Sequence, residues 1–259
     1  MALRAERAFG LTSLPTPQAG PSGPGGEEKI VPLQITAETA TNFPQDHTQA
    51  PTALFTAKPL KTPEKTARLI ALNNNEVRCC TRCRLHETRT NTVFGEGDPD
   101  AKIFFIGEGP GENEDNTGRP FVGRAGELLN KWIAAMGLQR EQVYIANIVK
   151  CRPPQNREPA PDEVATCTPY LQRQLEIIRP QVIITVGRPA AQHMLQTKIS
   201  MGKLRGQWHD WRGTKLMPTY HPAYVLRSYT FETRSAVWND LQMVMRELDL
   251  PMPKKKSAE

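Results

Sequence analysis

The sequence has no long apolar run. No stretch of its 259 residues approaches the roughly 20 apolar residues that a membrane-spanning helix needs. The first residues also lack the apolar segment of a secretory signal. We therefore expect a protein of the cytoplasm that makes no membrane contact.

Cysteine is scarce, and its count is odd. The chain has five cysteines, at positions 79, 80, 83, 151 and 167, so they cannot all pair as disulfides. In a chain without a secretory signal, an odd number favours metal or cluster ligation. A disulfide framework is therefore not expected.

Acidic residues are outnumbered, but only in one part of the chain. Residues 1–64 hold five Lys or Arg and six Asp or Glu, which gives −1, whereas residues 65–259 hold 28 and 21, which gives +7. A basic folded region is compatible with a polyanionic partner such as nucleic acid. The lysines at 254–256 are typical of a solvated tail.

Composition divides the chain into three parts. Residues 1–64 contain nine of the 23 prolines and show no sustained helix or strand period, so we predict a disordered leader there. From Lys65 onward, apolar residues recur at helical spacing and lead into a CxxC motif. We predict an ordered domain at 65–250 and a basic tail at 251–259.

Short apolar runs alternate with amphipathic stretches along the ordered domain. We predict buried strands at 101–108, 143–149 and 181–187 and a hairpin leading into a last strand at 205–220. We predict helices near 123–137, at 161–178 and at 234–248. This alternation indicates an α/β fold with a mostly parallel sheet covered on both faces. Ligands of such sheets bind beyond the carboxyl ends of the strands, where the motifs described below fall.

Four of the cysteines could together bind one metal ion or one cluster. Cys80 and Cys83 form a CxxC pair, and Cys151 and Cys167 flank a loop and most of a predicted helix. An all-cysteine site suits either structural zinc or an iron–sulfur cluster. Zinc sites favour two short-range pairs, and only one pair here is short, so the spacing favours a cluster without excluding zinc. Unrelated thiols are the alternative, and we interpret Cys79 in this way.

A glycine-rich turn follows the first predicted strand, with the sequence GEGPGENEDNTGRPFVGRAGELLN over residues 107–130. Glycines allow the backbone to approach a ligand closely, and nucleotide-binding folds use the same device. However, Glu108, Glu112, Glu114 and Asp115 would repel a diphosphate. So many acidic side chains in one turn favour a site that acts on a substrate on which positive charge develops during the reaction.

Together these segments resemble one enzyme family. The family 4 uracil-DNA glycosylases, the iron–sulfur branch of their superfamily, match in order and spacing the segments GEGPG, GRPFVG, ANIVKCRPPQNR (146–157) and HPAYVLR (221–227), and the four cysteines. The resemblance covers about residues 76–248. It implies a three-layer α/β sandwich around a central, mostly parallel four-stranded sheet. It also implies hydrolysis of the N-glycosidic bond of uracil in DNA, which leaves an abasic site.

The resemblance implies four residues with roles in activity. Glu108 would lie near the scissile bond, and Glu114 would serve activity and the exclusion of thymine. Asn156 matches a residue needed for activity, and His221 would donate a hydrogen bond to uracil O2 as negative charge develops. A carboxylate and a neutral donor on opposite sides suit a bond that breaks into a sugar cation and a base anion.

It also implies residues that hold the substrate and the cluster. Gly109 would lie in the loop that activates water, Phe121 would stack on the uracil ring and Asn147 would pair with the uracil edge. Leu226 or its neighbours would wedge into the duplex where the base had been. A [4Fe–4S] cluster would be ligated by Cys80, Cys83, Cys151 and Cys167. The partner would be uracil-containing DNA, single- or double-stranded, bound by a monomer.

Other interpretations remain open for single residues and for the whole chain. Phe121 could be ordinary core, Asn147 a strand-end cap and His221 a turn residue satisfied by the backbone. The identity of a general base is also open, because Gly109 stands where better-known uracil glycosylases carry an aspartate. The chain could instead be a catalytically silent iron–sulfur DNA-binding module, or a zinc-stabilised nucleotide-binding protein. No inserted basic loop with a reactive histidine precedes the last motif, so turnover is expected rather than crosslinking to DNA.

Overall fold

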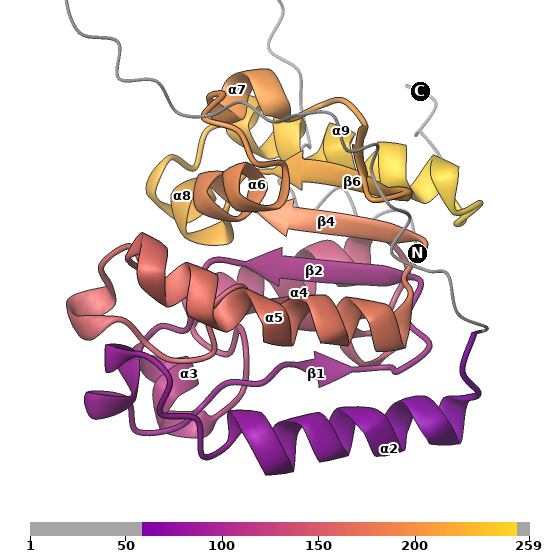
Figure 1. Ribbon diagram of the computed structural model, residues 1–259. Helices are drawn as coiled ribbons and strands as arrows, with labels where there is room; N and C mark the ends of the chain where they lie inside the picture. Colours follow the sequence, from indigo (N-terminus) through magenta and orange to yellow (C-terminus); the bar gives the residue numbers. More distant parts are fainter. Residues whose placement is uncertain (1–58, 253–259) are drawn as a thin grey trace, which may run out of the picture.

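The computed structural model describes residues 59–252 (Figure 1). Most of the predicted leader and of the basic tail therefore lies outside the described residues. The first helix of the described region, α2 (Thr62–Leu72), begins three residues before the predicted start of the ordered domain. A proline at the start of α2 explains this position, because its missing N–H would be unpaired there in any residue.

A mixed sheet of six strands forms the centre of the described region. Its four central strands are parallel and lie in the order β3 (Tyr144–Asn147), β2 (Ile103–Gly107), β4 (Val182–Val186) and β6 (Thr214–Thr219). Two antiparallel strands form the edges, β1 (Glu96–Gly97) and β5 (His209–Trp211). The prediction of a mostly parallel α/β sheet is confirmed, but the number of four strands was wrong. Edge strands of two and three residues are too short to show a period in the sequence.

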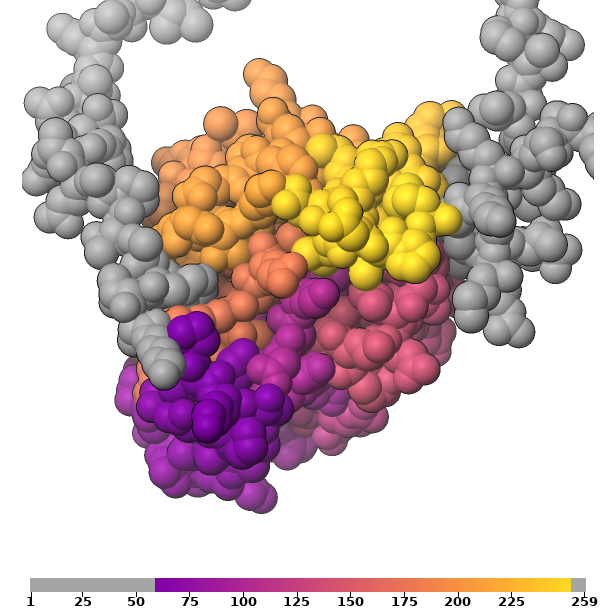
Figure 2. Space-filling model, turned by 90° about the vertical axis from the view of Figure 1, so that its right-hand side faces the viewer, coloured from indigo at the N-terminus to yellow at the C-terminus, as the bar shows by residue number. Residues whose placement is uncertain are grey.

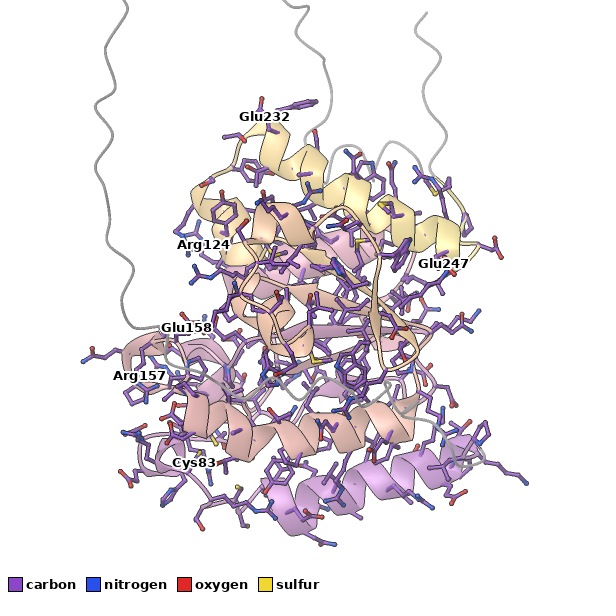
Figure 3. The ribbon with its side chains drawn as sticks, turned by 45° about the horizontal axis from the view of Figure 1, so that its top comes forward. Cys83, Arg124, Arg157, Glu158, Glu232 and Glu247 are labelled. Carbon is purple, nitrogen blue, oxygen red and sulfur yellow. The ribbon has the colours of Figure 1, made fainter. Side chains whose placement is uncertain are left out.

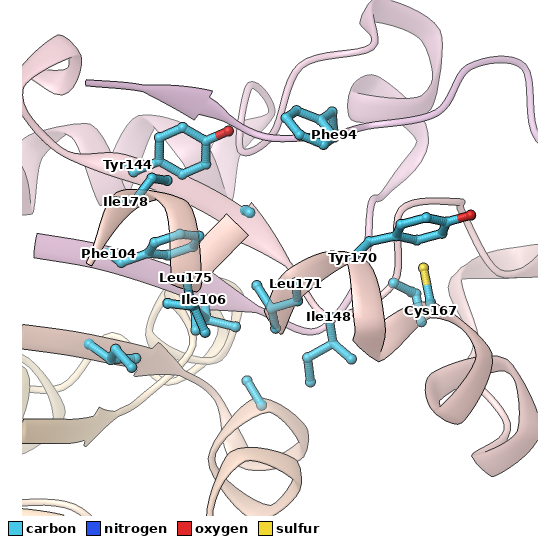
Figure 4. Close-up of a cluster of buried hydrophobic side chains, with 14 of the residues drawn as sticks. Phe94, Phe104, Ile106, Tyr144, Ile148, Cys167, Tyr170, Leu171, Leu175 and Ile178 are labelled. Atoms are coloured by element: carbon cyan, nitrogen blue, oxygen red, sulfur yellow. The ribbon is translucent and has the colours of Figure 1, made fainter. Parts of the chain in front are cut away.

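Alternate residues of the central strands face two separate hydrophobic clusters. Ile103 and Phe105 of β2 belong to the cluster under α4 (Arg124–Ala135) and α9 (Phe231–Glu247). Phe104 and Ile106 belong to the cluster under α2 and α5 (Pro161–Ile178), shown in Figure 4. Figure 1 shows α5 and α2 on one side of the sheet and α4 on the other. A strand covered on both faces is apolar throughout, which explains the continuous apolar run of β2.

The predicted helices are present, with bounds that their caps explain. Helix α5 begins at Pro161, where the Glu163 carboxylate accepts the N–H of Ala160 at 2.7 Å. Helix α9 begins three residues earlier than 234, because the Thr230 hydroxyl accepts the N–H of Thr233. None of the described helices combines the length and apolarity required for crossing a lipid bilayer.

Short helices and turns occupy the ends of the sheet. The short α-helices are α3 (Glu112–Thr117), α6 (Arg188–Met194), α7 (Met201–Leu204) and α8 (Pro222–Arg227). The remaining turns are η1 (Asn73–Val77), η2 (Arg84–Glu87), η3 (Arg140–Gln142) and η4 (Pro154–Asn156). Helices α3, α6 and α8 lie toward the carboxyl ends of the parallel strands (Figure 1). Figure 2 faces the opposite end, where α2 (indigo) and α9 (yellow) lie on different sides of the surface.

Candidate active site and cysteine cavity

A cleft of about 860 Å³ opens beyond the carboxyl ends of the parallel strands. Its walls include all but one of the eight predicted activity and substrate residues, namely Glu108, Gly109, Glu114, Phe121, Asn147, Asn156 and His221. These residues come from segments far apart in the chain. The fold therefore brings the four sequence motifs together at one place.

The floor of the cleft is formed where β2 and β3 end side by side. Gly107 is paired in register with Asn147, and any side chain at 107 would collide with the Asn147 amide and the Phe121 ring. The Asn147 side chain is 1% exposed, and its Oδ1 atom has no hydrogen-bond partner among the described residues. A buried acceptor of this kind is costly unless a ligand supplies a donor.

Phe121 has two environments at once. Its ring belongs to the hydrophobic cluster under α4, yet it also lines the cleft. Its backbone lies in the left-handed region, with φ 51°, which is uncommon for a bulky residue. The ring lies 5.8 Å from the imidazole of His221, centroid to centroid. The two interpretations of Phe121, core and cleft wall, are thus compatible.

His221 caps the start of α8. Its Nδ1 atom accepts the N–H of Ala223 at 3.1 Å. Burial is the main cause that lowers the pKa of His221 to about 4, and Arg227 adds to it, while Glu114 acts in the opposite direction. The imidazole is therefore neutral near pH 7. Because Nδ1 is an acceptor, the proton is assigned to Nε2, which makes Nε2 a neutral donor.

Glu108 is a half-buried carboxylate at the edge of the cleft. Burial raises its pKa to about 7, and the negative charge of Glu158 adds to this rise, whereas Arg188 opposes it. The carboxylate takes no hydrogen bond from the described residues. A carboxyl group poised near neutrality in a cleft is typical of a functional site.

The other acids of the turn have different roles from Glu108. Glu114 accepts three backbone N–H groups, from Gly111 at 3.1 Å, Val122 at 2.9 Å and Gly123 at 3.1 Å. It therefore holds the loop after β2 against the loop before α4. Buried Asp115 likewise accepts backbone N–H groups of residues 90 and 91. The sequence suggests that the four acids form one charged set. In the structure they differ, because two of them accept hydrogen bonds from backbone N–H groups.

Asn156 lies exposed at the rim of the cleft, on η4. Its Oδ1 atom accepts a hydrogen bond from Arg152 Nε at 2.8 Å. Asn156 and Gln155 both have φ 55°, a left-handed conformation that asparagine tolerates better than most residues. The turn thus directs this side chain toward the opening.

Leu226 is the predicted residue that does not line the cleft. It is half-buried and packs against the cluster under α4. On the same helix, Tyr224 and Arg227 line the cleft, and Tyr224 is 42% exposed. The sequence prediction covered them only as unnamed neighbours of Leu226, although their spacing of three residues on a short helix is a signal of a shared face.

The four predicted cysteine ligands line one separate cavity. Each sulfur accepts a hydrogen bond: Cys80 from the Tyr170 hydroxyl, Cys83 from the N–H of Leu85, Cys151 from Arg89 and Cys167 from the N–H of Lys150. Within residues 59–252, no three His, Cys, Asp or Glu side chains form a set suited to a single metal ion. The four cysteines instead line one small cavity. Cys79 is exposed and lies outside this cavity, as expected for a spare thiol.

The surroundings of the cysteines disfavour the deprotonated, thiolate form of their side chains. Burial raises the pKa of Cys167 to about 12 and raises the pKa of Cys151, while Lys150 and Arg89 act in the opposite direction. Sequence reasoning missed Arg89, which lies at the cavity and donates to Cys151 at 3.0 Å. Arg84 instead pairs with Asp162 on α5. Only the fold decides which cations reach the sulfurs.

Comparison with known proteins agrees with this geometry. Residues 94–242 match the family model of the uracil DNA glycosylase superfamily. The chain is 49% identical over 176 residues to a type-4 uracil-DNA glycosylase of Thermotoga maritima, which covers 67% of this chain and 92% of that protein. It is 48% identical over 183 residues to the type-4 enzyme of Saccharolobus solfataricus, covering 67% and 84%. It is 46% identical over 182 residues to that of Sulfurisphaera tokodaii, covering 67% and 81%. The chain belongs to the uracil DNA glycosylase superfamily and, within it, to the type-4 family.

Proposed function

We propose that this chain hydrolyses the N-glycosidic bond between uracil and deoxyribose in DNA, as a repair enzyme, and leaves an abasic site. One observation carries the proposal: the unpaired Oδ1 atom of buried Asn147 faces a cleft that Phe121, His221 and Glu108 also line. Such a cleft suits one base that has left the stack.

Asn147 accounts for the choice of base. Its Oδ1 would accept the N3–H of uracil and its amide N–H would donate to O4. Cytosine presents the reverse pattern at both atoms, so it would leave the buried amide mispaired. A site that depends on a hydrogen bond to the substrate strongly rejects an analogue that cannot make it. The Phe121 ring supplies the stacking surface for the extruded base.

His221 and Glu108 account for bond cleavage. As the bond breaks, negative charge develops on the base and positive charge on the sugar. The neutral Nε2–H of His221 would donate to uracil O2 and stabilise the departing anion. The Glu108 carboxylate would stabilise the sugar cation and orient the attacking water together with the backbone at Gly109. Asn156 would help hold the substrate at the rim.

Glu114 acts as a positioning residue in this mechanism. Its carboxylate is occupied by three backbone N–H groups, so it is not available as a base. It keeps the loop that carries Glu108 and Gly109 in register with the segment that carries Phe121. The loss of Glu114 would therefore misplace both sides of the cleft.

The cysteine cavity fits a [4Fe–4S] cluster held by Cys80, Cys83, Cys151 and Cys167. The donor set is all sulfur, each sulfur accepts a hydrogen bond, and all four cysteines line one cavity. A bound cluster would supply a structural crosslink between the loop before η2, the segment after β3 and helix α5. Zinc at the same residues would give colourless protein, so visible absorbance and iron content distinguish the two metals.

The cleft rim suits a polyanion. Arg157, Arg188 and Arg227 line it, and Figure 3 shows Arg157 at the same end of the molecule as Cys83. Cations at a rim position a nucleic acid through its phosphates without reading sequence. The wedge predicted at Leu226 or its neighbours would come from α8. We propose a monomer acting on single- or double-stranded uracil-containing DNA.

The test is base release from defined oligonucleotides. Purified protein is incubated with otherwise identical strands that carry uracil or thymine, and alkali then cuts the strand at abasic sites. We expect uracil-dependent breaks from the wild type and from Glu112→Gln, whose exposed carboxylate belongs to the same turn but lies outside the cleft. We expect almost none from Asn147→Ala. If the wild type releases no uracil but still binds the DNA, the chain is the silent module instead.

A further inference from the structure

Lys150 is a fully buried lysine between the cleft and the cysteine cavity. It lies three residues after Asn147, is 1% exposed and borders the cysteine cavity. Lysine is almost never fully buried unless its amine is paired. Within residues 59–252, no carboxylate forms an ion pair with Lys150, so its burial needs another reason.

The Lys150 amine makes two short hydrogen bonds. It donates to the backbone carbonyl oxygen of Asn147 at 2.8 Å and to Gln174 Oε1 at 2.6 Å. Gln174 is itself fully buried on α5 and donates to the carbonyl oxygen of Phe94 at 2.9 Å. A chain of hydrogen bonds therefore runs from the end of β3 to α5.

The same residue contacts the cysteine cavity through its backbone. The N–H of Lys150 donates to Cys167 Sγ at 3.2 Å, and Cys167 lies on α5 two turns before Gln174. Lys150 thus touches α5 at two points, one beside a predicted cluster ligand and one through its amine. Its amine also holds the peptide whose side chain bears the unpaired Oδ1.

We propose that Lys150 is a positioning residue for uracil recognition, which fixes the Asn147 peptide against the helix that carries Cys167. This inference rests on the proposed function. A side chain that must meet N3–H and O4 at once tolerates little displacement, and the residues that orient a site commonly matter almost as much as the site itself. Without the Lys150 amine, the carbonyl oxygen of Asn147 loses this hydrogen bond and its connection to Gln174.

The test compares Lys150→Met with a matched control, Lys65→Met. Lys65 is also buried, and its amine also donates to a backbone carbonyl oxygen, that of Ile178 at 2.9 Å. It lies at the other end of α5, far along the chain from the cleft motifs, and pairs with Asp100. Both variants lose a buried amine and its hydrogen bonds, so both destabilise the fold. Only Lys150→Met should change uracil recognition.

The readout is binding to two DNA duplexes as well as base release. One duplex carries 2′-fluoro-2′-deoxyuridine, whose glycosidic bond resists cleavage, and the other carries a tetrahydrofuran abasic analogue. We expect Lys150→Met to bind the fluorinated uracil duplex about 10- to 100-fold more weakly. Its binding to the abasic duplex and its iron content should match those of wild type. Lys65→Met should leave both affinities unchanged.

Equal losses on the two duplexes, or no loss on either, would overturn the inference. If Lys150→Met does not fold, Gln174→Met replaces it, because it removes the second acceptor of the amine. It should weaken binding to the fluorinated uracil duplex selectively, and an unchanged ratio of the two affinities would again contradict the proposal. Failure of the proposed function looks different: the wild type would then not prefer the fluorinated uracil duplex over its thymine counterpart.

Discussion

The cleft and the cysteine cavity are separated by one short segment, yet their polar atoms are arranged in opposite ways. In the cysteine cavity every sulfur accepts a hydrogen bond from the chain itself. In the cleft, among the described residues, the Oδ1 atom of Asn147 has no partner and the Glu108 carboxylate accepts no hydrogen bond. The chain itself supplies the hydrogen-bond donors of the cysteine cavity, whereas the cleft contains acceptors that a ligand could pair. Substitutions in the cleft should therefore cost activity, and those in the cavity should cost stability first.

The largest expected effect is at Asn147. Asn147→Ala should lower kcat/KM for uracil release by about 10²- to 10³-fold, the usual result of removing one preorganised polar group. The melting temperature should stay near that of wild type, because the lost Oδ1 atom has no hydrogen bond to lose in the free protein. Single-turnover base release and thermal melting measure the two effects. A marked fall in melting temperature would contradict the expectation that substitutions in the cleft affect activity rather than stability.

Glu108 should give the next largest effect, with a pH dependence. Its pKa of about 7 means that the carboxylate is populated as the pH rises through 7. The wild-type rate should therefore increase with pH across this range and level off above it. Glu108→Gln should lower kcat by about 10²-fold and remove that rise. A variant that keeps the rise would show that another group titrates.

The cysteine cavity should respond mainly in stability. Cys167→Ser should lower the melting temperature by more than about 4 °C, equivalent to more than about 1 kcal/mol for a domain of this size, because it removes a buried ligand. Cys79→Ser is the matched control, since this exposed thiol lies outside the cavity, and it should change nothing. Calorimetry and visible absorbance follow both. Equal stability of the two variants would contradict a structural centre.

The smallest expected effect separates two neighbours on α8. Tyr224→Ala should weaken binding to uracil-containing DNA by about 5-fold, since an exposed aromatic ring at a nucleic-acid site contributes about 1 kcal/mol by stacking. Leu226→Ala should mainly lower the melting temperature, because Leu226 packs on the hydrophobic cluster. If Leu226→Ala weakens binding more than Tyr224→Ala does, Leu226 is the wedge after all.

Local patterns predicted the parallel core of the fold well. The strand at 101–108 contains β2, and the bounds of α5 are those expected from Pro161 and its acidic first turn. The hairpin predicted at 205–220 contains β5 and β6, but the edge strand β1 was not predicted, because pairing with a neighbour rather than residue preference creates it. The four cysteines that line one cavity were singled out from the sequence, but Arg89 was not, since its position depends on how a loop crosses the cavity.

The sequence by itself determined the α/β class, the family and the set of motif residues, because strand and helix periods and short motifs are local properties. Only the tertiary structure decided which of those residues face the cleft and which ones bind other parts of the chain. In the structure, the carboxylates of Glu114 and Asp115 accept backbone N–H groups, whereas that of Glu108 accepts no hydrogen bond from the described residues. Leu226 packs on the hydrophobic cluster, and Tyr224 lies at the rim of the cleft. Burial and hydrogen-bond partners set these roles, and both depend on which distant segments meet once the sheet has formed.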